Sequence, residues 1–181
     1  MAQAVLWSPN VDPAVLTLMP APDFLSSVSS APLIGLGADR DSPDGRHVIH
    51  GVDVVTQLLL HSGSDPNGPL AALIPLDADT LGRIEALTRF WRAWQGRPTP
   101  PDTRVTAQKR RRLRLMMRAA DGRANGASYR EIAIVFYGYK RIAADPWKTS
   151  ALRDAVIGLV ESATAMIGGG YLQILRHRRR S

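Results

Sequence analysis

The sequence predicts an α+β protein: a small β-rich N-terminal module with one helix, then an all-α, helix-turn-helix-type C-terminal domain. Three observations support this division. The charge is unevenly distributed, a proline-rich break lies at mid-chain, and short Val/Ile/Leu runs give way to helical periodicity. The chain has 181 residues, 45% of them hydrophobic, which is enough for two small cores.

The charge changes sign along the chain. Residues 1–100 carry 6 Lys/Arg and 10 Asp/Glu, a net charge of −4, whereas residues 101–181 carry 17 and 6, a net charge of +11. Three prolines within Gly96–Asp102 favour an extended linker. We therefore expect a module over residues 1–96, a linker over 97–102 and a basic domain over 103–181, whose charge indicates a polyanionic partner.

Short apolar runs bounded by Pro and Gly predict the strands of the first module. They are Ala14–Leu18, Pro32–Leu36, His47–Leu60 and Leu70–Leu76. Asp44-Gly45 is a hairpin-turn signal. Asp79 can cap a following helix, whose expected buried stripe is Leu81, Ile84, Leu87, Trp91 and Trp94. We interpret this half as a packing or interaction module.

The first predicted helix of the basic domain spans Ala107–Arg123, with Thr106 as its N-cap. Its expected buried face is Leu113, Met116, Met117 and Ala120. Six cations without an acidic partner cover most of the rest: Lys109, Arg110, Arg111, Arg112, Arg114 and Arg118. Such a run is either a solvated surface or a face whose mutual repulsion a polyanion relieves.

Two further helices are predicted. Ser128-Tyr129-Arg130-Glu131 has the capping-box pattern and predicts a short helix over Tyr129–Tyr137. Asp145 as N-cap and Pro146 at the first helical position predict a third helix to about Ile167, ended by Gly168–Gly170. The Gly138–Asp145 connection is longer than the usual turn of about 3–4 residues. It is either a phosphate-contacting loop or part of an ordinary helical hairpin.

Candidate DNA contacts follow from this arrangement, because recognition helices present their first residues to base edges. The base-contact candidates are Lys148, Thr149, Ser150 and Arg153. The phosphate-contact candidates are Lys109, Arg110, Arg111, Arg114, Arg130, Lys140, Arg141, Arg178, Arg179 and Arg180.

The sequence gives no support for disulfide bonds, metal sites or enzyme catalysis. The chain has no cysteine, which removes disulfides and thiolate sites, and its four histidines form no metal-binding pattern. No P-loop or nucleophile-elbow motif is present. We expect no enzyme activity, no cofactor and no metal. The first ten residues do not resemble a secretory signal, and no run approaches the roughly 20 apolar residues of a membrane span, so we expect a cytoplasmic protein without membrane contact.

Several segments resemble one family. Gly126–Ala133, Ala144–Asp154 and Gly169-Gly170-Tyr171, with Pro75–Asp79 and Arg89–Arg92 upstream, are similar to the RovC-like DNA-binding domain family. The resemblance covers about His47–Tyr171. Members are proteobacterial transcriptional activators and anti-activators, often linked to secretion genes or mobile integrative elements. The resemblance implies a helix-turn-helix protein that controls transcription in bacteria, and it brings no catalytic residue.

The leading hypothesis is a sequence-specific regulator that binds double-stranded DNA through a recognition helix over about residues 146–167. It would act as a homo-oligomer, with another transcriptional regulator or RNA polymerase as further partners. One alternative is an anti-activator that binds a related regulator instead of DNA. Another is an RNA-binding protein, against which the low aromatic content of 6% argues.

Overall fold

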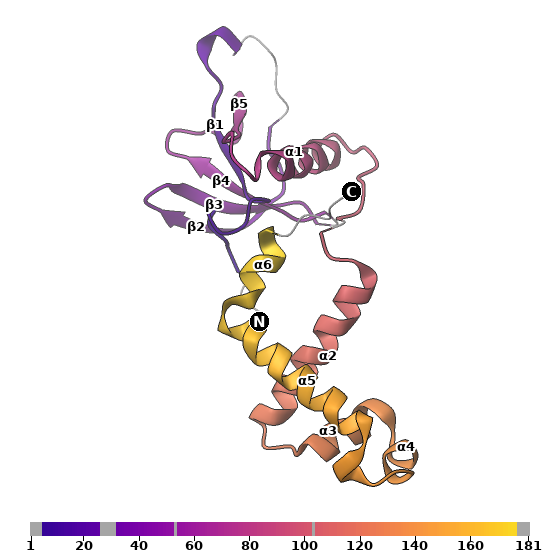
Figure 1. Ribbon diagram of the computed structural model, residues 1–181. Coiled ribbons are helices and arrows are strands. Elements are labelled where there is room, and N and C mark those ends of the chain that lie inside the picture. The colour runs from indigo at the N-terminus through magenta and orange to yellow at the C-terminus, as the bar shows by residue number, and fades with distance from the viewer. Residues whose placement is uncertain (1–4, 26–31, 53, 103, 177–181) are drawn as a thin grey trace. The chain divides into compact units, whose positions relative to one another are not determined.

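The computed structural model describes residues 5–25, 32–52, 54–102 and 104–176, which form two compact units (Figure 1). The sheet unit comprises residues 1–102 with 175–181, and the helical unit comprises residues 103–174.

The sheet unit contains a five-stranded mixed sheet. Its strands are β1 (Leu16–Pro20), β2 (Leu36–Ser42), β3 (Gly45–His50), β4 (Thr56–His61) and β5 (Leu70–Leu73), with a 3₁₀ turn, η1, at Asp23–Leu25. The order is β2-β3-β4-β1-β5, in which β1 and β4 are parallel and the other neighbours antiparallel. The predicted His47–Leu60 run is thus divided between two strands, and of Pro32–Leu36 only Leu36 enters a strand.

The Asp44-Gly45 signal is confirmed, because β2 and β3 form a hairpin at this point. Gly45 has a φ of 135° and pairs with His61 of β4. A Cβ atom at this position would lie 2.2 Å from the carbonyl oxygen of Leu60. The turn therefore requires glycine for both its backbone conformation and its close approach to β4.

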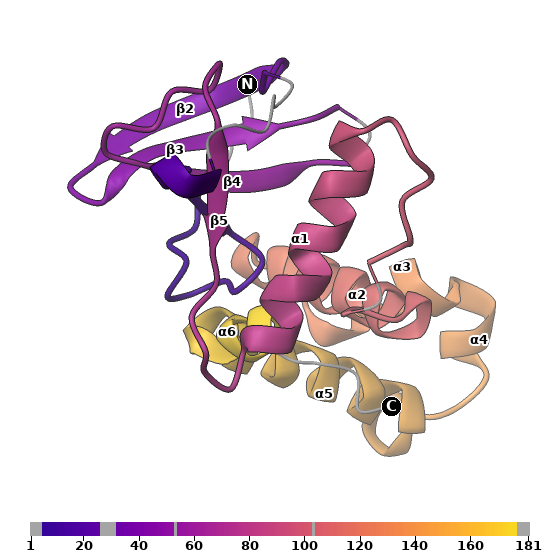
Figure 2. The same cartoon turned by 90° about the horizontal axis from the view of Figure 1, so that it is seen from above.

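Alternating leucines create the core of the sheet unit. Leu16, Leu58 and Val48 are cross-strand neighbours and almost fully buried. Helix α1 (Thr80–Trp94) lies across this face of the sheet (Figure 2). It contributes Ala86 and Phe90 to the core.

The predicted buried stripe of this helix is right for Leu87 and Trp94, which pack against the core, and wrong for its other three members. Leu81 is 71% exposed, and Ile84 and Trp91 are also exposed, whereas Arg83, Ala86 and Phe90 face inward. The packed face of α1 combines Leu87 and Trp94 with Arg83, Ala86 and Phe90, while Leu81, Ile84 and Trp91 lie outside it. Asp79 occupies the N-cap position without a side-chain capping bond.

The helical unit consists of four α-helices, which are 5 to 18 residues long, and a bent C-terminal segment that follows them. The elements are α2 (Ala107–Ala124), α3 (Tyr129–Tyr137), α4 (Tyr139–Ala143), the 3₁₀ turn η2 (Trp147–Thr149), α5 (Ala151–Ala165), the π-helical turn η3 (Met166–Gly170) and α6 (Tyr171–Arg176). The buried residues at its core are Met116, Ala119, Ile132, Ala133, Ile142, Val156, Leu159 and Ala163.

Two predicted helix starts are confirmed. The Thr106 hydroxyl accepts a hydrogen bond from the Lys109 amide at 3.2 Å and begins α2. At α3, the Ser128 hydroxyl accepts from the Glu131 amide at 3.2 Å, while the Ser128 amide donates to Glu131 at 2.7 Å. The Ser128 amide, together with the Ser128 hydroxyl, which also donates to the Glu131 carboxylate at 2.7 Å, holds the pKa of Glu131 below its ordinary value. The expected burial of Met117 is wrong, since this side chain is 66% exposed.

The predicted start of the third helix at Asp145 is also wrong. Pro146 has an extended ψ of 119°, the chain makes the η2 turn, and α5 begins only after Ser150, whose hydroxyl accepts from the Leu152 amide at 3.2 Å. The connection after Gly138 contains the short helix α4, because Ile142 is buried in the core and anchors one helical turn there.

Beyond α5 the chain bends at Gly169, whose φ is 120°, before α6 begins. The stretch Ala151–Arg176 is long and apolar enough to cross a membrane by length and composition, because an 18-residue window within it has a mean hydropathy of 1.4. Core helices pass the same test. Here Val156, Leu159 and Ala163 pack in the core of the helical unit, and the non-helical Gly169 interrupts the stretch.

His50, the last residue of β3, is a buried titratable group in the sheet unit. It is 7% exposed, and its ring lies edge-on to Phe90 at 5.3 Å. Burial holds the pKa of His50 below its ordinary value of 6.5, and a hydrogen bond with the backbone of Ile34 opposes the shift in part. Protonation therefore favours the unfolded chain.

We predict that the sheet unit loses stability as the pH falls below about 6.5, the ordinary pKa of histidine. Between that value and the lowered folded pKa of His50, the unfolded chain binds more protons. Stability is therefore fully present above this window and lost through it. Thermal unfolding of the wild type and of His50→Phe at pH 7.5 and 5 tests this. The decrease should be smaller in His50→Phe, and an equal decrease in both proteins would contradict it.

Candidate nucleic-acid interface

Helix α2 has two chemically different sides. Met116 and Ala119 are buried in the core of the helical unit. On the opposite side, Arg111, Arg114 and Arg118 are exposed and follow one another at spacings of three and four residues. This spacing places them on one face of a helix. We call these three residues the arginine face, and Arg110 lies exposed at its border.

The positive charge of α2 is not neutralised by acidic neighbours. Among the described residues, none of the six cations between Lys109 and Arg118 forms a salt bridge. The salt bridge described within the helical unit joins Arg153 and Asp154 at 3.3 Å. This unit contains 13 Lys/Arg and 5 Asp/Glu. The arginine face therefore retains its charge for an external partner.

Lys109 is separated from the arginine face. It lines, with Arg112, a groove of about 570 Å³ whose floor includes Leu113, Met116 and Met166. Positions 109 and 111 are about 200° apart around the helix axis, because each residue advances about 100°. The structure thus divides the predicted phosphate contacts of α2 between two sides.

Arginine–aromatic contacts join α2 to α3. The Arg118 guanidinium lies 5.2 Å from the ring centre of Phe136, and that of Arg123 lies 4.6 Å from Tyr129. Arg123 also donates to the Ala127 carbonyl at 2.6 Å. Stacking on an aromatic face leaves the edge of a guanidinium available for a further acceptor. These contacts fix where the arginines lie without removing their charge.

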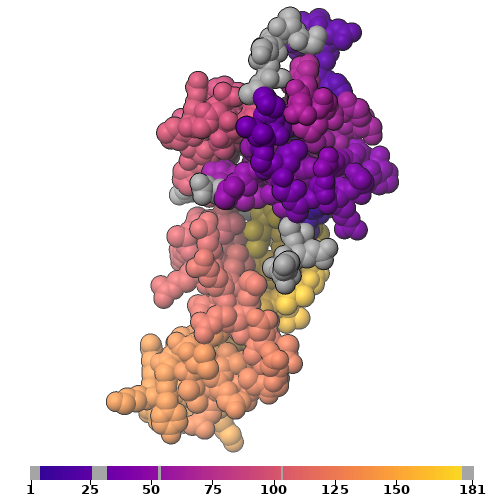
Figure 3. All heavy atoms as spheres, turned by 180° about the vertical axis from the view of Figure 1, so that it is seen from behind, coloured from indigo at the N-terminus to yellow at the C-terminus, as the bar shows by residue number. Residues whose placement is uncertain are grey.

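A second group of cations lies on α3, α4 and η2. Its members are Arg130, Lys140, Arg141 and Lys148, and all four are exposed. Figure 1 shows α3 and α4 side by side, and Figure 3 shows long side chains projecting from the orange α3–α4 region. Tyr139 of α4, 66% exposed, is a surface residue that the sequence analysis missed. The buried Ile142, four residues after Gly138, is the signal that could have identified α4.

The four base-contact candidates differ in how far their side chains are exposed and in whether their polar groups are already hydrogen-bonded. Ser150 is 8% exposed, and its hydroxyl is occupied as the α5 cap. Lys148 and Thr149 are exposed in η2, and the Thr149 hydroxyl donates to the Pro146 carbonyl at 3.3 Å. The side chain of Arg153 is 41% exposed in the first turn of α5. Arg178, Arg179 and Arg180 lie outside the described residues.

Comparison with known families matches residues 73–176 to RovC_DNA-bd, described as a T6SS transcription factor DNA-binding domain. The match covers more than half of the chain. The chain belongs to this family. No curated protein matches it. The RovC_DNA-bd match begins at the end of β5 and includes α1 with the whole helical unit, while residues 47–72, part of the resemblance, lie outside it.

Membership of the RovC_DNA-bd family makes this protein a DNA-binding transcription factor, which is not an enzyme class. No group of three or more potential metal-ligating side chains occurs in the part of the chain that the structure describes. The basic helical unit and the family assignment therefore point to the same ligand, DNA.

We predict that Ser150, and not Asp145, is the cap that stabilises α5. Ser150→Ala removes an N-cap bond and should lower the free energy of unfolding by about 1 kcal/mol. Asp145→Ala, at an exposed position before η2, is the matched control and should change it by less than about 0.5 kcal/mol. Urea denaturation followed by circular dichroism measures both. A larger loss of unfolding free energy in Asp145→Ala than in Ser150→Ala would contradict this and favour a helix that begins at Asp145.

Proposed function

We propose that this protein is a sequence-specific regulator whose helical unit binds duplex DNA. The arginine face of α2 contacts the phosphate backbone, and the start of α5 approaches the major groove. The observation that carries the proposal is the row of Arg111, Arg114 and Arg118, exposed and without a described acidic partner in a DNA-binding family domain. Arginine forks match phosphate geometry and supply affinity independently of sequence.

The dimensions of the arginine face suit a phosphate backbone. Arg111 and Arg118 are seven residues apart, which is about 10 Å along a helix. Phosphates of one DNA strand follow each other at about 3.4 Å along the axis. Because the backbone winds around the duplex, successive phosphates lie farther apart in space than this axial rise, and the face is long enough for about two of them. Lys109 lies on the groove side and is left out of this contact set.

Recognition is assigned to α3 and α5 as a helix-turn-helix variant. Both helices begin at a serine N-cap, Ser128 and Ser150, and they pack against each other through Ile132, Val156 and their neighbours. The connection between them is long because it contains α4 and η2. On this proposal Lys148, Thr149 and Arg153 approach the bases, while Arg130, Lys140 and Arg141 contact the adjacent phosphates.

We further propose that the protein acts in the cytoplasm as a homo-oligomer. Helix-turn-helix proteins usually bind paired half-sites as dimers. The sheet unit offers an apolar surface for self-association, because Leu81, Ile84 and Trp91 of α1 are exposed. Exposed apolar patches of this kind are typical of interaction sites. An oligomer would bring two helical units to one operator.

We predict that the arginine face determines the salt dependence of DNA binding. In the full chain, Arg111→Ala with Arg114→Ala should reduce the slope of log K against log salt by about 1.8, since each phosphate contact contributes about 0.9. Fluorescence anisotropy with a labelled 25-base-pair duplex at several salt concentrations measures this slope.

The matched control is Lys109→Ala with Arg112→Ala, which removes the same charge from the groove side of the same helix. Its slope should change by less than half as much. Equal changes in the two double variants would show that only net charge matters, and no change in either would refute the proposed backbone contact. If the wild type does not bind any duplex but retains a related regulator, the anti-activator alternative is favoured.

A further inference from the structure

The groove of about 570 Å³ in the helical unit is not used by the proposed DNA contacts. One wall is a single face of α2, on which Lys109, Arg112, Leu113 and Met116 follow one another at helical spacing. The other wall is formed by α5, the η3 turn and α6. Its lining residues are Ser162, Ala165, Met166, Gly170 and Gln173. All residues of both walls belong to the helical unit, so the groove lies within that unit.

The charge of this groove has one sign. Lys109 and Arg112 line it, and none of the described residues that line it is acidic. Neither cation forms a salt bridge with a described residue. The lining therefore presents two positive charges that no neighbouring carboxylate balances, and it attracts an anion.

The α2 wall is cationic at one end and apolar at the other. Leu113 is partly buried, and Met116 is buried in the core of the helical unit, against which Met166 of the opposite wall also packs. Methionine side chains are flexible and polarisable, so they adapt to the shape of a bound apolar group. A ligand that fits this wall needs a negative charge at one end and an apolar chain at the other.

The opposite wall is shaped by the η3 turn. Gly169 has a φ of 120°, and a Cβ atom at Gly170 would lie 3.0 Å from the carbonyl oxygen of Ala165. The turn is therefore tight at the position where its backbone lines the groove. Single π-helical turns are rare and occur frequently at functional sites.

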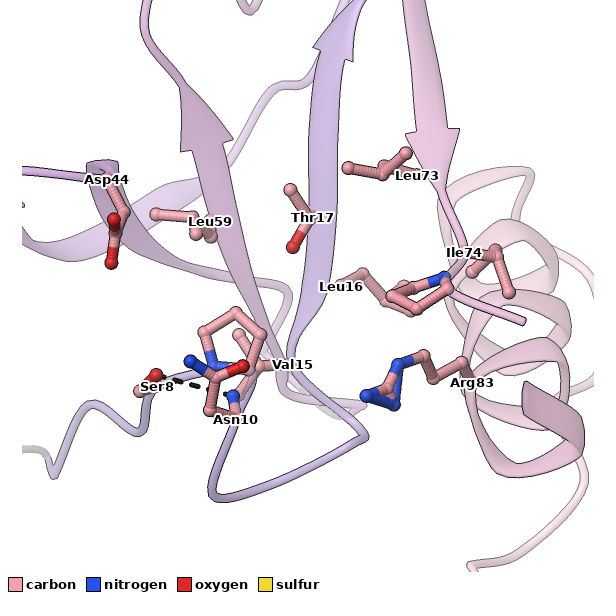
Figure 4. Close-up of a pocket in the computed structure, with 12 residues that line it drawn as sticks. Ser8, Asn10, Val15, Leu16, Thr17, Asp44, Leu59, Leu73, Ile74 and Arg83 are labelled. Carbon is pink, nitrogen blue, oxygen red and sulfur yellow. Dashed lines mark hydrogen bonds between the residues drawn. The ribbon is translucent and has the colours of Figure 1, made fainter. Parts of the chain in front are cut away.

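The sheet unit has a smaller cavity, of about 210 Å³, whose charges do not select an anion (Figure 4). Arg83 lines it, but the Arg83 guanidinium is already ion-paired with Asp77 at 3.2 Å. Asp44 lines the same cavity, and Figure 4 shows Asp44 and Arg83 at opposite ends of the lining. A further carboxylate would be repelled there. The groove of the helical unit is different, because both of its charges are positive.

We propose that the groove binds a single-chain amphipathic anion, which is the chemistry of a medium-chain fatty acid. The carboxylate accepts hydrogen bonds from the Lys109 ammonium and the Arg112 guanidinium. The alkyl chain lies against Leu113, Met116 and Met166. The volume of the groove is within the range of about 300–1,000 Å³ typical of small-molecule sites.

The length of the α2 wall defines the length of the chain. Lys109 and Met116 are seven residues apart, which is about 10 Å along the helix. An extended chain gains about 1.2 Å per bond, so a ligand of about eight to ten carbons spans this wall. Longer chains should gain little further contact with α2.

The test is isothermal titration calorimetry of the full chain with octanoate, decanoate and dodecanoate, below their micelle concentrations and at constant ionic strength. We expect saturable binding that tightens by about two- to fourfold per methylene from octanoate to decanoate, because full burial of a methylene is worth about fourfold. Dodecanoate should bind no more than about twofold more tightly than decanoate. Acetate supplies the charge alone and 1-octanol the chain alone, and each should bind at least about tenfold more weakly than octanoate.

A pair of double variants tests the contribution of the two cations. Lys109→Ala with Arg112→Ala should weaken decanoate binding by at least about tenfold and leave the binding of 1-octanol unchanged. Arg111→Ala with Arg114→Ala removes the same charge from the opposite side of α2. This matched control should retain the affinity for decanoate.

A pair of tryptophan substitutions tests the location of the alkyl chain. Ala165→Trp places a large side chain at an exposed position of the groove and should abolish the binding of all three fatty acids. Ala155→Trp, at an exposed position of α5 outside the groove lining, should leave it unchanged.

The proposal is overturned if none of the fatty acids binds saturably, or if both double variants retain the wild-type affinity for decanoate. Binding of an amphipathic helical peptide of Leu and Glu, without binding of the fatty acids, would also overturn it and make the groove a protein-docking site. The titrations contain no DNA. Their result is therefore independent of whether the arginine face contacts the phosphate backbone.

Discussion

The packing of α2 against α5 is the interaction on which the functional surface depends. Six cations within ten residues of α2 repel one another along the helix. Burial of Met116 and Ala119 against Val156 and Leu159 holds the helix in place despite this repulsion. The same burial fixes the rotation of α2 about its axis. The opposite side, with Arg111 and Arg114, must then face outward.

This constraint turns a run of basic residues into a surface with two sides. Neighbouring cations in the sequence are separated by the helical period, so Arg112 borders an apolar groove while Arg111 and Arg114 share an exposed face. The contact of Arg118 with Phe136 extends that face to α3. A phosphate backbone bound there would also relieve the repulsion, which links the stability of α2 to its proposed ligand.

Local signals in the sequence were sufficient where one short-range interaction decides the structure. The capping box at Ser128, the Thr106 cap and the Asp44-Gly45 turn involve atoms within a few residues, and the structure shows each of them. The basic surface of α2 followed from the run of cations within a segment of helical periodicity. These features required no knowledge of the tertiary packing.

Predictions failed where tertiary packing chooses between local alternatives. Asp145-Pro146 and Ser150 are both plausible helix starts, and the structure uses Ser150, with the η2 turn before it. Helix α1 is apolar around much of its circumference, and contact with the sheet buries the side that contains Phe90, Leu87 and Trp94 and leaves Leu81, Ile84 and Trp91 exposed. The cavity beside Arg83 could not be foreseen, because its walls come from segments more than 60 residues apart in the chain.

Site-directed cleavage of DNA tests most directly whether the arginine face lies on the backbone. The chain has no cysteine, so Ala107→Cys, on the same side as Arg111 and exposed, provides a single attachment point for an iron chelate that generates hydroxyl radicals. Ala165→Cys, beside the groove on the other side, is the control. The account predicts strand cleavage from position 107 and little from position 165. Cleavage from position 165 with none from position 107 would contradict it.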